Sequence, residues 1–262
     1  MRADQLLVDR GLAASRSQAQ RLIASGVQWR VGDVAWQRVA KNGDVLPLAC
    51  ELHLLDHAES RYVSRGGLKL EGALRDSGLQ VSGLRCLDVG QSTGGFTDCL
   101  LQQGAALVVG VDVGHGQLHP SLRSDPRVVC VERTNARELN ARELQAQDAR
   151  VPQGAQGFDL IVGDLSFISL TLVLPALLPF LKLGADVLML VKPQFELQPS
   201  DIGKGGLVKD PASYPKVELR LRDACAGLGL NVLGYWPSAI AGGDGNKEFW
   251  IGARRDEPQP EH

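Results

Sequence analysis

Short apolar runs alternate with amphipathic stretches along the chain from about residue 82 onward. Brief apolar runs ended by glycine or a charged residue predict buried strands, and apolar residues at every third or fourth position predict helices. We predict strands at residues 84–90, 106–114, 127–136, 158–167, 186–196, 231–239 and 248–255, and helices at 96–105, 174–185 and 213–230. This alternation predicts an α/β fold with a doubly wound parallel sheet, which binds ligands at the carboxyl ends of its strands.

The first sixty residues have a different pattern, which predicts a small separate α+β unit. Apolar pairs at residues 6–7 and 22–23 have helical surroundings, and Ser15 is suited to cap the second helix. A short strand at residues 27–31 follows and runs into a Gly-Asp turn.

Composition narrows the possible functions. The chain of 262 residues is 44% hydrophobic and carries a formal net charge of −2, so a chain-wide polyanion-binding surface is not expected. Its five cysteines are scattered without a CxxC pair, which predicts a reducing, cytoplasmic location and no metal site. The longest uncharged apolar run, residues 165–181, contains two prolines and is shorter than the ~20 residues of a membrane-spanning helix.

Basic residues gather in the N-terminal unit. Five arginines and only two acids lie between residues 2 and 30, which by charge alone fits a solvated helix face. The segment SRSQAQRLIASGVQWRVGD resembles the S4 RNA-binding domain. The resemblance implies that Arg2, Arg16 and Arg21 contact phosphates of structured RNA without reading its sequence.

The segment DVGQSTGGFTD, residues 88–98, follows a predicted strand and opens a helix. Its spacing does not match the G-x-G-x-x-G of dinucleotide folds or a P-loop. An acid ahead of such a loop is typical of S-adenosylmethionine methyltransferases, although a tight strand–helix turn would also use glycines. The predicted cofactor residues are Asp88, Gly90, Ser92, Thr93, Gly94, Gly95 and Phe96, with Asp112 facing the ribose and Asn135 the adenine.

Three charged residues end or open otherwise apolar strands. Asp164 closes LIVGD, Lys192 closes LMLVK and Glu248 opens EFW. Charges at such places are costly unless they are paired or exposed to solvent. Solvated strand ends would explain each one separately, but all three are predicted to meet at one rim of the sheet.

The whole chain resembles the TlyA family of ribosomal RNA 2'-O-methyltransferases, which also carry the name hemolysin and are related to the FtsJ-type fold. The segments that carry this likeness include SRGGLKL, DVGQSTGGFTD, ERTNAR, DLSFISL, VKPQFE, GKGGLVKD and GNKEF. It implies a Rossmann-like class I methyltransferase fold, S-adenosylmethionine as cofactor, and a cytidine of ribosomal RNA or of a ribosomal subunit as substrate. The family's Lys-Asp-Lys-Glu catalytic set falls on Lys69, Asp164, Lys192 and Glu248. Gln91 departs from the small residue that is common in the family.

In such a set a lysine can take the hydroxyl proton only when it is neutral, and the carboxylates orient the lysines. We expect Gly66 and Gly67 to form a turn that folds Lys69 back over the rim, with Arg65 beside it contacting RNA. The loop at residues 195–210 is predicted to be an RNA clamp or a mobile surface loop. The RNA clamp would use Lys204 and Lys209. Phe167, in another segment, is expected either to stack on a splayed base or to cover the core.

The predicted organisation is an S4-like domain at 1–60, a linker and helix at 61–81, a methyltransferase domain at 82–254 and a disordered tail at 255–262. The sequence alone also permits two other functions. One is a non-catalytic RNA-binding protein that kept the fold, which has no reason to hold four charged residues at strand ends. The other is a membrane-lytic protein, for which no spanning segment is predicted. No membrane and no protein partner is predicted.

Overall fold

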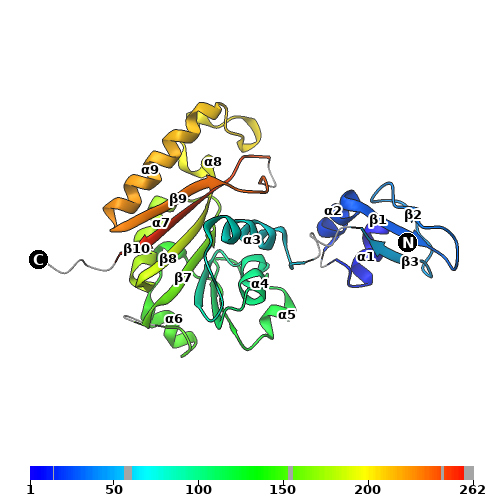
Figure 1. Cartoon of the computed structure of the whole chain (residues 1–262), viewed down its shortest axis with the longest axis horizontal. Coiled ribbons are helices and arrows are strands. Elements are labelled where there is room, and N and C mark those ends of the chain that lie inside the picture. The colour runs from blue at the N-terminus through cyan, green and yellow to red at the C-terminus, as the bar shows by residue number, and fades with distance from the viewer. Residues whose placement is uncertain (14, 56–60, 153–155, 243–244, 257–262) are drawn as a thin grey trace, which may run out of the picture. The chain divides into compact units, whose positions relative to one another are not determined.

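The computed structural model describes residues 1–262 except 14, 56–60, 153–155, 243–244 and 257–262 (Figure 1). The chain divides into two compact units, Met1–Leu68 and Lys69–His262.

The first unit contains two helices and a three-stranded antiparallel sheet with the order β2-β1-β3. Its helices and strands are α1 (Ala3–Asp9), α2 (Arg16–Gly26), β1 (Val27–Arg30), β2 (Gln37–Arg38) and β3 (Glu51–Leu54). Ser15 caps α2, because its hydroxyl accepts a 3.2 Å hydrogen bond from the Gln18 N–H. Leu7, Leu22 and Val27 lie in the unit's own apolar core.

Helix α3 (Arg65–Ser77) begins at the segment in which a turn was predicted. That prediction is wrong, because Gly66 and Gly67 form the first turn of the helix. Gly67 is needed for packing against a neighbouring side chain and not for a turn. A Cβ atom at Gly67 would lie 2.3 Å from Cγ of the buried Tyr62, so the glycine makes room for that ring.

The second unit is built on a seven-stranded sheet with the order β6-β5-β4-β7-β8-β10-β9. Strands β6, β5, β4, β7 and β8 are parallel, and β10 is antiparallel to both β8 and β9. The strands are β4 (Arg85–Val89), β5 (Leu107–Val111), β6 (Val128–Val131), β7 (Phe158–Asp164), β8 (Leu181–Val191), β9 (Leu230–Pro237) and β10 (Phe249–Arg255). The structure therefore confirms the predicted doubly wound α/β sheet.

Helices cover both faces of this sheet. The helices are α4 (Gly95–Gln102), α5 (Pro120–Arg123), α6 (Ala141–Gln147), α7 (Leu170–Leu177), α8 (Pro193–Glu196) and α9 (Tyr214–Gly227). Helices α7 and α9 share one large apolar core with alternate residues of the strands, Ile251 of β10 among them. Trp250 points to the opposite face and stacks on Phe96 of α4, with ring centres 5.6 Å apart. Both faces of the sheet are thus buried.

The helix predicted at 174–185 is shorter in the structure. Helix α7 ends at Leu177, a single 3-10 turn, Leu178–Phe180, follows, and β8 begins at Leu181. Pro179 lacks the N–H that would continue the helical hydrogen bonds, and Leu181 pairs with Phe158 of β7. The residues from Leu181 onward therefore belong to strand β8 and are not helical.

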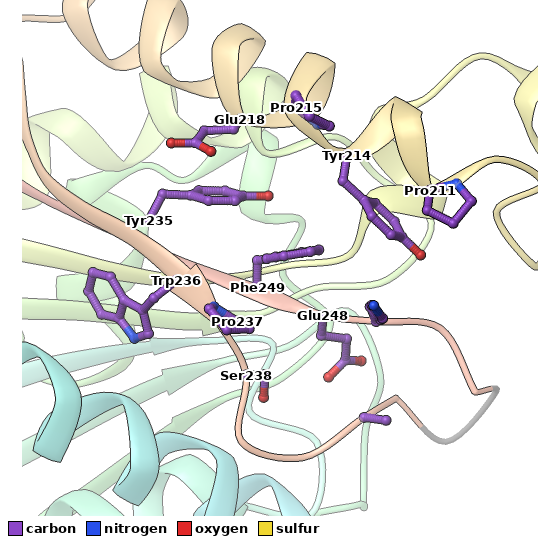
Figure 2. A pocket seen from close by; sticks show the side chains of 12 residues that line it. Pro211, Tyr214, Pro215, Glu218, Tyr235, Trp236, Pro237, Ser238, Glu248 and Phe249 are labelled. Carbon is purple, nitrogen blue, oxygen red and sulfur yellow. The ribbon is translucent and has the colours of Figure 1, made fainter.

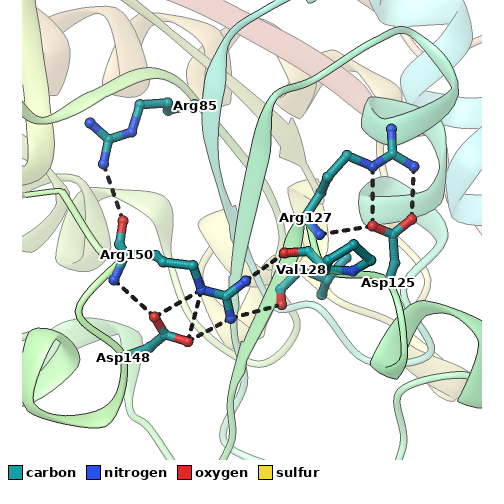
Figure 3. A network of polar contacts seen from close by, with 7 residues as sticks. Arg85, Asp125, Arg127, Val128, Asp148 and Arg150 are labelled. Carbon is teal, nitrogen blue, oxygen red and sulfur yellow. Dashed lines mark hydrogen bonds and ion pairs between the residues drawn. The ribbon is translucent and has the colours of Figure 1, made fainter.

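Arginines tie together the amino ends of the strands, opposite the rim that holds the predicted site (Figure 3). Arg150 pairs with Asp148 at 2.6 Å and donates to the carbonyl of Val128, where β6 begins, at 3.5 Å. Arg85, at the start of β4, donates to the Arg150 carbonyl at 3.1 Å. This network holds neighbouring strands in register away from the predicted site.

Strands β9 and β10 meet at a pair of glycines, Gly234 and Gly252, which are direct partners in the ladder. The ring of Trp236 fills the space above both. A Cβ at Gly234 would lie 2.5 Å from the ring, and one at Gly252 would lie 2.9 Å from it. Strand β10 includes Arg255, and residues 257–262 of the predicted tail lie outside the described residues. No helix among the residues that the structure describes is long and apolar enough to span a membrane.

Candidate active site

The four predicted catalytic residues lie on three strand ends and one helix of the second unit. Asp164 ends β7, Lys192 follows β8, Glu248 precedes β10, and Lys69 lies on α3. They form two ion pairs. Lys69 Nζ lies 2.5 Å from Glu248 Oε2, and Lys192 Nζ lies 2.5 Å from Asp164 Oδ1. Both carboxylates are thus placed to orient a lysine.

Burial controls the electrostatics of the first pair. Lys69 and Glu248 expose only 8% and 4% of their surfaces. Burial raises the pKa of Glu248, and Lys69, which donates a hydrogen bond to it, opposes the rise. The charges of Asp164 and Lys192 also act on Glu248. Lys69 is therefore held by a buried carboxylate, which sets it apart from a solvated surface lysine.

A cavity of about 430 Å³ opens over these residues and is lined by Lys69, Lys192, Glu248, Ser166, Phe167, Gln194, Phe195, Gly205 and Gly206. Ser166 accepts a 2.9 Å hydrogen bond from Lys192 Nζ. Phe167 is 90% exposed and has a φ of +66°, which is unusual for a bulky residue. Its ring centre lies 5.1 Å from that of Phe195. Phe167 therefore does not cover the core, and its ring is available to a ligand in the cavity.

The glycine- and lysine-bearing loop at residues 195–210 is tied to the segment that leads into Glu248 and β10. Buried Asn246 accepts a 3.1 Å hydrogen bond from Val208 N–H and donates one of 3.0 Å to the Gly206 carbonyl. Lys209 Nζ donates to the Ser200 carbonyl at 2.8 Å, whereas Lys204 is exposed. Sequence reasoning missed Asn246. The only sequence feature that could have identified it is its position two residues before Glu248.

The glycine-rich loop after β4 approaches the catalytic residues closely. Gly90 has a φ of +87°, and a Cβ there would lie 2.5 Å from the main-chain oxygen of Asp164. Gly94, at a φ of +95°, is the N-cap of α4. Ser92 and Thr93 are exposed at the tip of the loop, whereas Gly95 and Phe96 are buried. Only the tip and the backbone of this loop can therefore contact a ligand.

Asp88 anchors the loop from inside the protein. Gln91 donates to Thr97 at 2.9 Å, and Thr97 donates to Asp88 Oδ2 at 2.7 Å. Burial raises the pKa of Asp88 to about 7. Oδ1 of Asp88 has no hydrogen-bond partner among the described residues and can accept a donor supplied by a ligand. The unusual Gln91 has a structural role, since its side chain occupies the space above Gly110.

Asp112 lies at the end of β5 and faces the same loop. Its carboxylate accepts hydrogen bonds from the N–H groups of Ser92, at 2.8 Å, and Gly114, at 2.7 Å. Asn135 is exposed and caps a short 3-10 turn by accepting from Arg137 N–H at 3.1 Å. A strand-end acid beside an open glycine loop, with an unused buried acceptor below it, fits the amino and hydroxyl groups of S-adenosylmethionine.

The predicted RNA-binding arginines differ in their surroundings. Fully buried Asp4 pairs with both Arg2, at 3.0 Å, and Arg16, at 3.1 Å, and these arginines keep about half of their side-chain surfaces exposed. Arg21 donates to the Ser17 carbonyl at 3.2 Å, and Arg65 is half-buried at the start of α3. Within the described ranges, no cluster of His, Cys, Asp or Glu could hold a metal ion.

The chain is similar in sequence and in structure to several known proteins. Residues 62–255 match the model of the FtsJ-like methyltransferase family. The chain is 45% identical to the 16S/23S rRNA (cytidine-2'-O)-methyltransferase TlyA of Mycobacterium tuberculosis, with 97% of this chain and 89% of that protein covered. It is 35% identical to Hemolysin A of Brachyspira hyodysenteriae, with 95% and 98% covered. The solved structure of a protein from Streptococcus thermophilus, described as a candidate hemolysin, superposes with a TM-score of 0.73 at 39% identity and covers 98% of this chain and 89% of its own.

Proposed function

The chain belongs to the FtsJ-like methyltransferase family and depends on S-adenosylmethionine, and from this premise we propose that it methylates a ribose 2'-hydroxyl of ribosomal RNA, on a cytidine. One observation carries the proposal. Lys69, Lys192 and Glu248 line one cavity, Asp164 pairs with Lys192, and the glycine loop of the cofactor site approaches the backbone of Asp164 closely. A methyl donor in the loop and a hydroxyl in the cavity would then be neighbours.

Each residue of the site has a separate role in methyl transfer. S-adenosylmethionine supplies an electrophilic methyl group on a sulfonium. Lys192, held by Asp164 and Ser166, binds the 2'-hydroxyl and in its neutral form accepts the hydroxyl proton at Nζ. Lys69, held by Glu248, is a second cation at the edge of the cavity. Asp88, Gly90, Ser92, Thr93 and Asp112 bind the cofactor.

Phe167 supports an extended nucleotide as the substrate. Its exposed ring lies in the catalytic cavity, where it can stack on the base whose ribose reaches Lys192. The strained backbone at Phe167 holds the ring out from the protein surface.

The N-terminal unit provides an RNA anchor in this proposal. Its S4-like sequence, its two helices and the fixed positions of Arg2 and Arg16 support contacts to phosphates. Lys204 supplies a further cation at the loop over the cavity. A ribosomal RNA substrate supports a cytoplasmic location.

The deciding experiment measures transfer of tritiated methyl groups from S-adenosylmethionine to ribosomal subunits and to their naked RNAs. Nuclease digestion and chromatography then separate ribose from base methylation. We expect ribose methylation that Lys192→Ala abolishes. Lys182→Ala is the matched control, because Lys182 lies on β8, the strand that Lys192 follows, and pairs with Asp159 at 2.5 Å, away from the cavity.

Two outcomes would contradict the proposal. Transfer to no RNA by protein that binds the cofactor would leave the chain as a non-catalytic RNA-binding protein. Methylation of a base would show that the four charged residues serve a different chemistry.

A further inference from the structure

A second cavity, of about 660 Å³, lies between the N-terminal end of α9 and strands β9 and β10 (Figure 2). Glu248 lines both this cavity, which we call the aromatic pocket, and the catalytic cavity. A ligand in the aromatic pocket would therefore lie next to the catalytic residues. The volume falls within the range of about 300–1,000 Å³ that is usual for small-molecule sites.

The lining of the aromatic pocket is unusual for this chain. Aromatic residues make up only 5% of the sequence. The pocket nevertheless brings together three half-buried aromatic side chains, Tyr214, Tyr235 and Phe249. The ring of Phe249 lies 5.3 Å from that of Tyr214 and 5.3 Å from that of Tyr235. Partly exposed rings held against each other provide a rigid surface on which a flat ligand can stack.

Polar groups are placed at specific points of this apolar wall. The Tyr235 hydroxyl is buried and has no hydrogen-bond partner within the described part of the chain. Figure 2 shows Glu218 beside the Tyr235 ring, with the Tyr235 hydroxyl end directed toward Tyr214. Burial raises the pKa of Tyr235, so its hydroxyl stays protonated and can donate. The pocket thus offers a donor and a carboxylate acceptor to the edge of a flat ligand.

The lining of the aromatic pocket also includes a cation. Lys247 is exposed, lines the pocket and forms no ion pair with any described residue. An apolar ligand alone would leave the Tyr235 hydroxyl unsatisfied and would make no use of the exposed Lys247. A nucleotide supplies a flat ring, hydrogen-bonding edges and a phosphate at once.

We propose that the aromatic pocket holds an unstacked nucleobase of the substrate RNA, from a nucleotide adjacent to the one that is methylated. The inference rests on the proposed function, which places the target ribose at Lys192 and its base at Phe167. Lys247 contacts the phosphate between the two nucleotides. Glu218 Oε1 pairs with Arg222 at 2.8 Å, which leaves Oε2 as the acceptor for a ligand. Because Oε2 accepts from amino groups, bases with an exocyclic amine bind better than uracil.

Ultraviolet cross-linking tests the pocket without relying on turnover. The full chain is irradiated with unmodified ribosomal subunits and with their naked RNAs, digested with trypsin and nuclease, and analysed by mass spectrometry. We expect nucleotide adducts on two tryptic peptides, residues 210–216 with Tyr214 and residues 223–247 with Tyr235. Adducts confined to other peptides would overturn the inference.

Affinity measurements give an independent readout. Tyr214→Leu should weaken RNA binding about tenfold, as loss of one base stack does, and leave cofactor affinity unchanged. Lys247→Ala should lower the slope of log affinity against log salt by about one. Lys216→Ala is the matched control, since Lys216 is exposed on the same helix as Tyr214 but does not line the pocket.

The outcomes separate the two proposals. Ribose methylation with no pocket adducts and with wild-type RNA affinity of Tyr214→Leu would overturn the pocket and leave the enzyme assignment standing. Pocket adducts without any methyl transfer would support the pocket and overturn the assignment. The absence of both would overturn both.

Discussion

At the scale of single residues, the withdrawal of Lys69 from solvent argues against a simple phosphate contact. Its ammonium lies 2.5 Å from a buried carboxylate at the edge of the catalytic cavity. Lys69→Met should lower kcat by about 10²-fold or more, the usual range for a group that assists proton transfer, and change RNA affinity less than threefold. Single-turnover kinetics and equilibrium RNA binding measure the two effects separately.

Arg75→Ala serves as the control for Lys69, because Arg75 is an exposed cation on the same helix. Equal losses of turnover and of RNA affinity in Lys69→Met would mean that Lys69 only binds phosphate.

The raised pKa of Asp88 predicts that the free energy of unfolding depends on pH. Its pKa is about 7 in the folded protein, against an ordinary value of 3.8, and burial is the main cause. Between about pH 4 and 7 the folded chain holds a proton that the unfolded chain has lost. The free energy of unfolding therefore falls with rising pH by about 1.4 kcal/mol per unit from this group alone, and the fall ends above pH 7.

Asp88→Asn removes that contribution. The stability of the wild type relative to the variant should decrease from pH 5 to pH 7 and then become constant. Urea unfolding without cofactor measures it, and Glu143→Gln, at an exposed site on α6, should show no such trend. A constant difference across the whole range would mean that Asp88 is ionised throughout.

At the scale of elements, Asn246 joins two segments that are distant in sequence. Two hydrogen bonds hold the loop at Gly206 and Val208 to the segment that leads into Glu248. Asn246→Ala should free the loop, speed tryptic cleavage at exposed Lys204 several-fold and raise KM for RNA. Asn231→Ala, at an exposed position of β9, is the control. Cleavage at the wild-type rate would show that other contacts fix the loop.

The apolar strands could be predicted from the sequence, because each is short, continuous and ended by glycine or charge. Those strand ends also identified Asp164, Lys192 and Glu248. The position of Lys69 came from family resemblance, since nothing local shows that a helix brings it to Glu248. The aromatic pocket could not be predicted. Tyr214 opens a helix and Tyr235 lies on an edge strand, and only the tertiary arrangement brings them together.

At the scale of the whole molecule, the N-terminal unit is predicted to supply affinity while the second unit supplies chemistry. Arg16→Ala combined with Arg21→Ala should weaken RNA binding and reduce its salt dependence by about one unit of slope per lost phosphate contact. Turnover at saturating RNA should be unchanged. Filter binding over a salt series measures the slope.

Arg142→Ala, at an exposed arginine of α6, should bind RNA like the wild type. Unchanged affinity and slope in the double variant would mean that the arginines of α2 are not the anchor.

The glycine pair beneath Trp236 has a consequence for how relatives of this chain can diverge. Because one ring fills the space above both Gly234 and Gly252, neither position can gain a side chain while tryptophan is kept. The three positions should therefore co-vary. Relatives that replace either glycine should carry a smaller residue in place of Trp236.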